Sequence, residues 1–155
     1  MNVRFLRVRL KACNAVPRDA EAHLGFKVEN GVVRHLVLTS RGPVVVSKRC
    51  EDCVFYKLAS STYVRGTPTI HNGVIKIVVA DTRTARAILR QHEEQVISVE
   101  ELRHTSLVLT RKQREILSAL ANGSTIADMA RFSSRSKVAV HKIFRKALRK
   151  VVELI

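Results

Sequence analysis

Apolar and polar side chains alternate along the beginning of the chain. Over residues 3–11 apolar residues alternate with Arg and Lys, a period of two that predicts a half-buried β-strand. A second such region surrounds Asn30-Gly31, a dipeptide that adopts the positive φ angles of a two-residue hairpin turn. The apolar segments 26–29 and 32–39 on either side predict the strands of a β-hairpin.

The other patterns before residue 101 alternate between helix and strand. Residues 15–25 predict a short helix, with Pro17 in its first turn and Gly25 at its end. Residues 74–80 form a continuous β-branched run, which predicts a buried strand. The remaining predicted elements are short strands at 44–47 and 96–99, an extended segment at 60–65, a turn-rich segment at 66–73, a helix at 50–58, and a helix that Asp81 caps and that ends near residue 95.

All patterns in the last third of the chain are helical. Thr110 precedes Gln113 by three positions, the capping-box spacing in which each side chain binds the other residue's free backbone amide. Thr125 and Asp128 repeat this spacing at the start of a second short helix. Ser136 is placed to cap a final helix that runs almost to the C-terminus.

The spacing between the last two helices predicts that they cross. Ala130 and Val140 are ten positions apart, so a small residue on one helix meets an apolar residue on the next. Ser134 lies in the tight turn between them, and Phe132 is expected to fill the gap beside Arg135. This arrangement predicts a helix-turn-helix motif.

The second helix of this motif, residues 136–150, is the predicted recognition helix, which would enter the major groove of DNA. Its outward face carries Ser136, Lys137, Val138, His141, Lys142 and Arg145, of which all but Ser136 are expected to contact bases. Phosphate contacts are expected from Arg111, Lys112, Arg135, Lys146 and Arg149.

These patterns together predict a fold class and a domain organisation. Interleaved strands and helices favour an α+β domain of ferredoxin-like or ACT-like topology over residues 1–101. A polar linker is expected at 102–108, and residues 109–155 are expected to form an all-α helix-turn-helix domain.

Charge supports a nucleic-acid partner. The 155 residues include 28 Lys and Arg against 13 Asp and Glu, a net charge of +15. Self-repulsion on this scale is usually offset by a polyanion, most often nucleic acid, with a membrane surface as the alternative. After His104, eleven basic residues face three acidic ones, so the last 51 residues carry +8. No apolar run approaches the roughly 18 residues that span a bilayer, and no secretory signal is recognisable, so a cytoplasmic protein is expected.

Several motifs resemble one family. The segments LTRKQREIL, IADMA and VAVHKIFRKALRKVVEL, within residues 109–154, resemble the helix-turn-helix domain of archaeal regulators of the bacterio-opsin activator (Bat-like) type. That domain is itself similar to the DNA-binding domains of LuxR-type response regulators. Upstream, RCEDC, VIKIVVAD and VISVEEL resemble the α+β domain that precedes it in the family. The resemblance implies a sensor-like domain, a DNA-binding domain and a role in transcription regulation. Ser134 stands where the family usually has Gly, and Arg135 where it usually has an apolar residue.

The cysteines allow three interpretations. Cys50 and Cys53 have the C-x-x-C spacing that can hold one metal ion or form a redox disulfide. Metal binding would need Cys13 or a histidine as a further ligand, and small buried thiols are the remaining interpretation. Because no second C-x-x-C follows and the histidines show no ligand spacing, no metal or cofactor is predicted, and Cys50 and Cys53 remain the candidate ligands.

No pattern points to an enzyme. Neighbouring carboxylates such as Glu100 and Glu101 diverge on a strand or helix, and none of the six glycines forms a phosphate-binding loop. The sequence therefore predicts a sequence-specific regulator that binds double-stranded DNA. A nucleoid-associated or RNA-binding protein is the first alternative, and a redox or metal-sensing protein using Cys50 and Cys53 is the second.

A homodimer is expected, because two copies would bring two recognition helices to half-sites about one DNA turn apart. The apolar residues at positions 147, 148, 151, 152 and 155 either pack within the domain or form the dimer seam.

Overall fold

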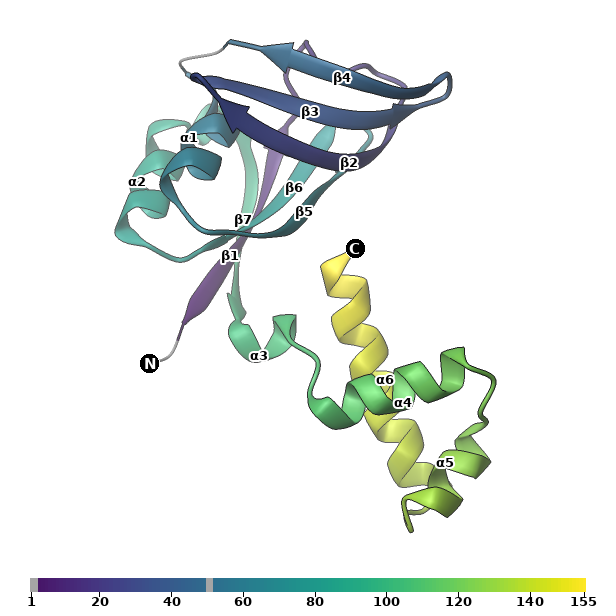
Figure 1. Ribbon diagram of the computed structural model, residues 1–155. Helices are drawn as coiled ribbons and strands as arrows, with labels where there is room; N and C mark the ends of the chain where they lie inside the picture. Colours follow the sequence, from purple (N-terminus) through teal and green to yellow (C-terminus); the bar gives the residue numbers. More distant parts are fainter. Residues whose placement is uncertain (1–2, 50–51) are drawn as a thin grey trace. The chain divides into compact units, whose positions relative to one another are not determined.

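The computed structural model describes residues 3–49 and 52–155 (Figure 1). The chain divides into two compact units, Met1–Leu102 and Arg103–Ile155. The first holds β1 (Arg4–Lys11), β2 (Ala20–Glu29), β3 (Val32–Thr39), β4 (Gly42–Lys48), α1 (Val54–Ser61), β5 (Val64–His71), β6 (Val74–Ala80), α2 (Arg83–Gln91), the 3-10 helix η1 (Glu93–Gln95) and β7 (Val96–Arg103), whose last residue begins the second unit. The second unit continues with α3 (His104–Leu107), α4 (Arg111–Ala121), α5 (Ile126–Phe132) and α6 (Lys137–Leu154).

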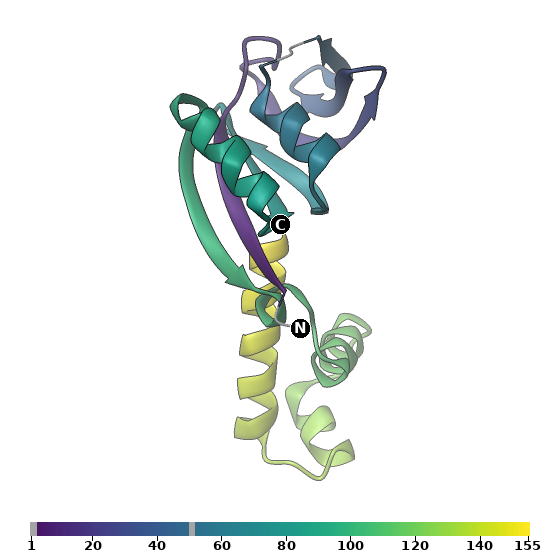
Figure 2. The same ribbon diagram turned by 90° about the vertical axis from the view of Figure 1, so that its left-hand side faces the viewer.

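The larger sheet of the N-terminal unit has the strand order β5-β6-β1-β7. The alternating pattern of residues 3–11 correctly predicts β1, which pairs antiparallel with β6 and places Leu6 beside Val79. Leu6, Val8 and Leu10 are buried in a core to which α1 and α2 contribute Leu58 and Leu89. Figure 2 shows α2 lying across one face of β1 and β7.

The smaller sheet has the order β2-β3-β4 and is the upper sheet in Figure 1. The predicted hairpin at Asn30-Gly31 is confirmed, with φ angles of 51° and 74° at these two residues. The helix predicted over 15–25 is wrong, because β2 begins at Ala20 and pairs with β3 along its length. Gly25 adjoins a shift in strand register instead of ending a helix. Pairing with a neighbouring strand overrides the local Pro and Gly signals here.

The predicted fold class is wrong. Instead of a ferredoxin-like or ACT-like domain followed by an all-α helix-turn-helix domain, the described residues form seven strands in two antiparallel sheets together with the helices. The segment from β2 to β4 folds back on itself at two turns and satisfies its backbone hydrogen bonds locally. Periodicity identifies such strands one at a time, but it does not assign them to a sheet.

Several predicted boundaries also change. The turn-rich segment 66–73 is mostly strand β5, with a register shift between Arg65 and Thr69, and the turn itself is only Asn72-Gly73. Thr82, not Asp81, caps α2 by accepting a hydrogen bond from the Ala85 amide. The residues of the predicted linker, 102–108, include the end of β7 and all of α3.

In the C-terminal unit, α4 and α5 both pack against α6 (Figure 2). Ile116, Ala130 and Val140 form its small buried cluster, and Ala147 is buried further along α6. The Lys150 ammonium donates a 2.8 Å hydrogen bond to the carbonyl before α4, at Val108. Across both described segments, no helix is long and apolar enough to cross a membrane.

Candidate nucleic-acid interface

Two backbone hydrogen bonds close the turn between α5 and α6. The Arg135 amide donates to the Ala130 carbonyl at 3.0 Å, and the Ser134 amide donates to the Arg131 carbonyl at 3.4 Å. Ser134 has a φ of 51°, in the left-handed region. This is the Schellman arrangement, which usually has Gly at that position, and a residue with a side chain adopts it at a cost of about 1 kcal/mol. The chain therefore reaches the start of α6 through a defined turn.

Side-chain caps fix the starts of both helices. The Thr125 hydroxyl accepts a 3.1 Å hydrogen bond from the Asp128 amide, and the Thr125 amide donates at 2.9 Å to the Asp128 carboxylate. The side-chain hydrogen bond from Thr125 holds the pKa of Asp128 below its ordinary value. The Ser136 hydroxyl accepts at 3.1 Å from the Ala139 amide. All of these caps were predicted by the spacing of polar residues and are confirmed.

The predicted contact between the two helices is also confirmed. Ala130 of α5 and Val140 of α6 are both buried in the same cluster, with Ile116 of α4 against them. Phe132 does not fill the gap beside Arg135, because its side chain is 85% exposed. It lies two positions beyond Ala130, which turns it toward the opposite side of the helix.

The outward face of α6 carries the six residues proposed for the major groove. Ser136, Lys137, Val138, His141, Lys142 and Arg145 are all exposed. Val138 is an apolar residue on this face with 65% of its surface exposed. The structure thus places one polar and basic face opposite the apolar side that holds α6 on its neighbours.

The residues proposed for phosphate contacts are more dispersed. Arg135 lies in the turn, and Lys146 and Arg149 are exposed further along α6. On α4, Arg111 is exposed but forms a 2.8 Å ion pair with Glu115, and Lys112 is half-buried. The turn and α6 therefore offer the cations of this set that are both exposed and without an ion pair to another described residue.

Sequence reasoning missed one basic residue of this surface, Arg131. A shallow hollow of about 400 Å³ lies where α5 meets α6, and its lining residues are Ala127, Ala130, Arg131, Arg135 and Lys137. Three of these five are cations, of which Arg131 forms a 3.3 Å ion pair with Asp128, and the hollow adjoins the capped start of α6, where the helix dipole favours an anion. The spacing of four between Arg131 and Arg135 was the available signal. The hollow fits the charge of a backbone phosphate.

The N-terminal unit contains a separate group of thiol and imidazole side chains. Cys13, Cys53 and His35 line one small cavity of about 60 Å³. Cys50 of the C-x-x-C pair lies outside the described residues, and within those residues no three His, Cys, Asp or Glu side chains are arranged to hold a metal ion. His35 Nδ1 lies 2.9 Å from His23 Nε2, and both rings are buried. Burial, followed by the neighbouring His35, lowers the pKa of His23 to about 4. No ligand spacing in the sequence indicates this pair.

Comparison with protein-family models, curated proteins and solved structures finds no match to this chain. The resemblance to archaeal regulators of the bacterio-opsin activator type therefore stays a prediction.

Proposed function

We propose that the protein is a sequence-specific transcription regulator that binds double-stranded DNA and is not an enzyme. The observation that carries this proposal is the exposed polar and basic face of α6, presented by a helix whose start and crossing angle are fixed by α5 and the turn. A major groove about 12 Å wide admits one α-helix, and helix-turn-helix proteins insert the N-terminal part of the second helix. In the cell, such a regulator would act where the DNA is, in the cytoplasm.

The chemistry of this face suits base edges as well as phosphates. Lys142 and Arg145 can donate hydrogen bonds to guanine, and Val138 can contact a thymine methyl group. The exposed apolar surface of Val138 supports base reading, since phosphates are bound by charged and hydrogen-bonding groups and an apolar side chain contributes nothing to that contact. A phosphate in the hollow beside Arg131 and Arg135 would fix the position of α6 along the groove.

The test begins with selection of duplexes from a random DNA pool by the full-length protein. The selected duplex is then compared with a scrambled duplex and an RNA stem of equal length, at two salt concentrations. A specific regulator binds its site roughly a thousandfold or more tighter than random sequence. We expect a shared sequence motif among the selected duplexes and a preference of that order that persists at the higher salt.

Two other outcomes would contradict the proposal. Equal affinity for unrelated duplexes with a steep salt dependence would indicate a nucleoid-associated protein. Tighter binding to the RNA stem than to any duplex would indicate an RNA-binding protein.

A further inference from the structure

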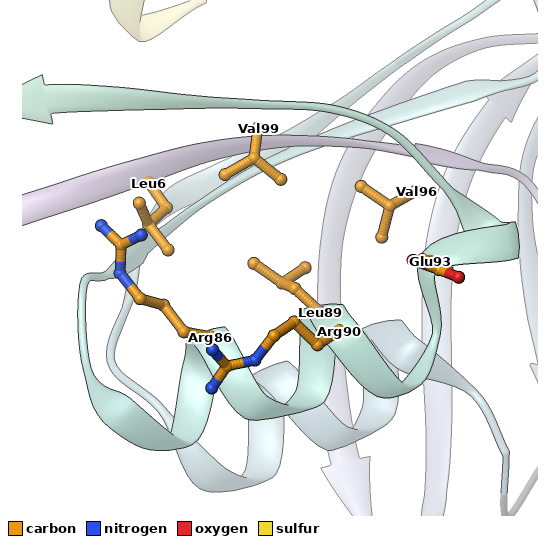
Figure 3. Close-up of a pocket in the computed structure, with 7 residues that line it drawn as sticks. All are labelled: Leu6, Arg86, Leu89, Arg90, Glu93, Val96 and Val99. Carbon is orange, nitrogen blue, oxygen red and sulfur yellow. The ribbon is translucent and has the colours of Figure 1, made fainter.

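An apolar groove lies between α2 and β7 of the N-terminal unit. Its volume is about 350 Å³, and Figure 3 shows α2 on one side of it and β7 on the other. The apolar residues that line it are Leu6, Leu89, Val96 and Val99, and the charged ones are Arg86, Arg90 and Glu93. The groove is thus an apolar surface with charged groups of both signs.

Strand β7, which forms one wall of the groove, is the edge of its sheet. In the described part of the chain β7 is hydrogen-bonded to β1 on one side only, whereas the opposite edge strand, β5, packs against β2. Ile97 and Val99 of β7 are 44% and 45% exposed. An exposed edge strand with apolar side chains is a template for pairing with another strand.

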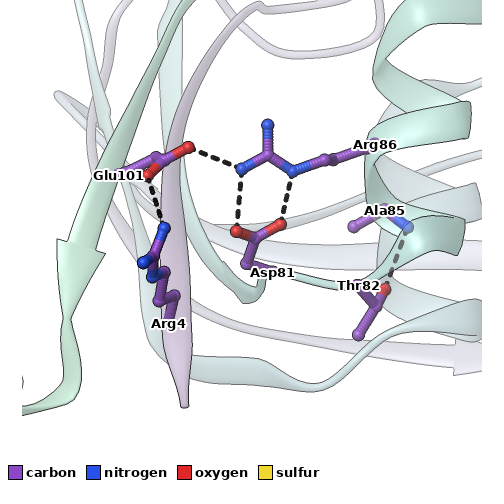
Figure 4. A network of polar contacts seen from close by, with 6 residues as sticks. All are labelled: Arg4, Asp81, Thr82, Ala85, Arg86 and Glu101. Carbon is purple, nitrogen blue, oxygen red and sulfur yellow. Dashed lines mark hydrogen bonds and ion pairs between the residues drawn. The ribbon is translucent and has the colours of Figure 1, made fainter. Parts of the chain in front are cut away.

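An ion-pair network holds this edge in place (Figure 4). Arg86 of α2 donates to both carboxylate oxygens of Asp81, at 2.6 and 2.8 Å, and to Glu101 of β7 at 2.6 Å. Arg4 of β1 approaches Glu101 within 3.5 Å. The edge strand is therefore tied to both α2 and β1, so a partner would meet a preformed surface with little ordering to do.

The charge of this region differs from that of the rest of the chain. Residues 93–101 contain four Glu and no Lys or Arg, and α2 contains three Arg and no Asp or Glu. The two segments together are almost neutral, in a chain whose net charge is +15. Copies of a strongly basic chain repel each other, so a locally neutral apolar surface is where they can meet. At the rim of the groove, Arg90 and Glu93 form no ion pair with any other described residue.

We infer that the α2–β7 face binds a second copy of this chain across a two-fold axis that passes beside the first residues of β7, so that the two copies meet edge to edge there. In a two-fold contact each residue i meets residue j and j meets i, so Arg90 of each copy can face Glu93 of the other. Val96 and Val99 of both copies would then close the two grooves into one apolar core. The inference does not depend on DNA binding, and its test uses no DNA.

Two other exposed apolar surfaces are alternative sites for a dimer interface. Strand β4 is the edge of the smaller sheet and exposes Val45, but Pro43 within that strand opposes edge pairing. The apolar stripe of α6 exposes Val152 with 64% of its surface accessible. The α2–β7 face, by contrast, combines a groove with charges of both signs at its rim.

The test is sedimentation equilibrium of the full-length protein from about 1 to 100 µM, a range that resolves ordinary homodimers. We expect a wild-type dimer, and a dissociation constant at least tenfold higher for Val99→Glu, since a charge would enter the apolar centre of the interface. Val45→Glu and Val152→Glu are the matched controls and should leave the dimer unchanged. Circular dichroism of each variant checks that it is folded.

A charge exchange provides a second test that does not touch the apolar residues. Arg90→Glu and Glu93→Arg should each weaken the dimer, and the double variant should restore it. A wild-type chain that is monomeric throughout this range would overturn the inference. So would dissociation caused by Val45→Glu or Val152→Glu but not by Val99→Glu, or single charge changes without effect on a folded protein. Monomers whose melting temperature rises with an apolar small molecule in the groove would instead identify a ligand site.

Discussion

The two units of the chain differ in how far apart in sequence their stabilising contacts are. In the N-terminal unit, Leu6 of β1 pairs with Val79 of β6. The core of this unit contains side chains from strands and from helices. In the C-terminal unit the buried cluster around Val140 is small, and the helix starts are fixed by caps such as that of Thr125 on Asp128. The N-terminal unit should therefore respond most to changes in its core, and the C-terminal unit to changes in caps and turns.

The largest expected effect is in the N-terminal core. Leu58→Ala removes a fully buried side chain of α1 and should lower the stability of this unit by about 3 kcal/mol, because a cavity adds to the lost burial. Both tyrosines, Tyr56 and Tyr63, belong to this unit, so tyrosine fluorescence during urea unfolding reports on it. Leu24→Ala, at an exposed position of β2, is the control and should change little. Equal losses in both variants would contradict the assignment of this core.

The next effect is a pH dependence that is specific to the N-terminal unit. Burial lowers the pKa of His23 from 6.5 to about 4, so between these values the unfolded chain binds a proton that the folded chain does not. Stability should be complete above pH 6.5 and fall by up to about 3 kcal/mol as the pH decreases toward 4. The buried His35, whose pKa is also lowered by burial, acts in the same direction.

Asp81 and Asp128, whose pKa values are lowered, stay charged over most of the range between pH 6.5 and 4. They therefore do not cause the same fall in stability. Tyrosine fluorescence in urea at several pH values measures the effect. In a His23→Leu variant the free energy of unfolding should change less with pH than in the wild type. An unchanged pH dependence would show that groups other than His23 cause the effect.

A smaller effect is expected from a helix cap of the C-terminal unit. Thr125→Ala removes the hydroxyl that accepts from the Asp128 amide and should destabilise α5 by about 1 kcal/mol. Helical circular dichroism during unfolding measures the loss, while the tyrosine signal should not move. Thr125→Ser keeps the hydroxyl and should retain most of the stability, so an equal loss in both variants would exclude the cap as the cause.

The smallest effect has the opposite sign. Ser134→Gly should stabilise the turn by somewhat less than about 1 kcal/mol, since Gly adopts a positive φ without the cost of a side chain but gains entropy when unfolded. The same measurement by circular dichroism applies. A destabilised variant would show that the Ser134 side chain contributes interactions that outweigh its backbone cost.

The sequence predicted local features well and long-range ones poorly. The caps at Thr125 and Ser136 and the Ala130–Val140 contact depend on residues within ten positions of each other, and all three are present. The helix predicted over 15–25 failed because β2 is stabilised by its pairing with β3. The two-sheet arrangement could not be read from periodicity, which identifies a strand but not its partners.

The same distinction applies to the candidate sites. The exposed residues of α6 follow from helical spacing alone. The contact between His23 and His35 depends on the register of β2 and β3, which no spacing rule for metal ligands would detect. The groove between α2 and β7 depends on segments that meet only after the whole unit has folded.

The measurement that tests the central claim most directly compares two variants of the full-length protein on the selected duplex and on scrambled DNA. Lys142→Ala should reduce the preference for the selected duplex by about 1–3 kcal/mol, because a base contact is lost. Arg149→Ala should weaken binding to both duplexes about equally. It should also reduce the slope of log affinity against log salt concentration by about one, because one phosphate contact is lost. The same loss of preference from both variants, or from neither, would contradict the division of α6 into base-reading and phosphate-binding residues.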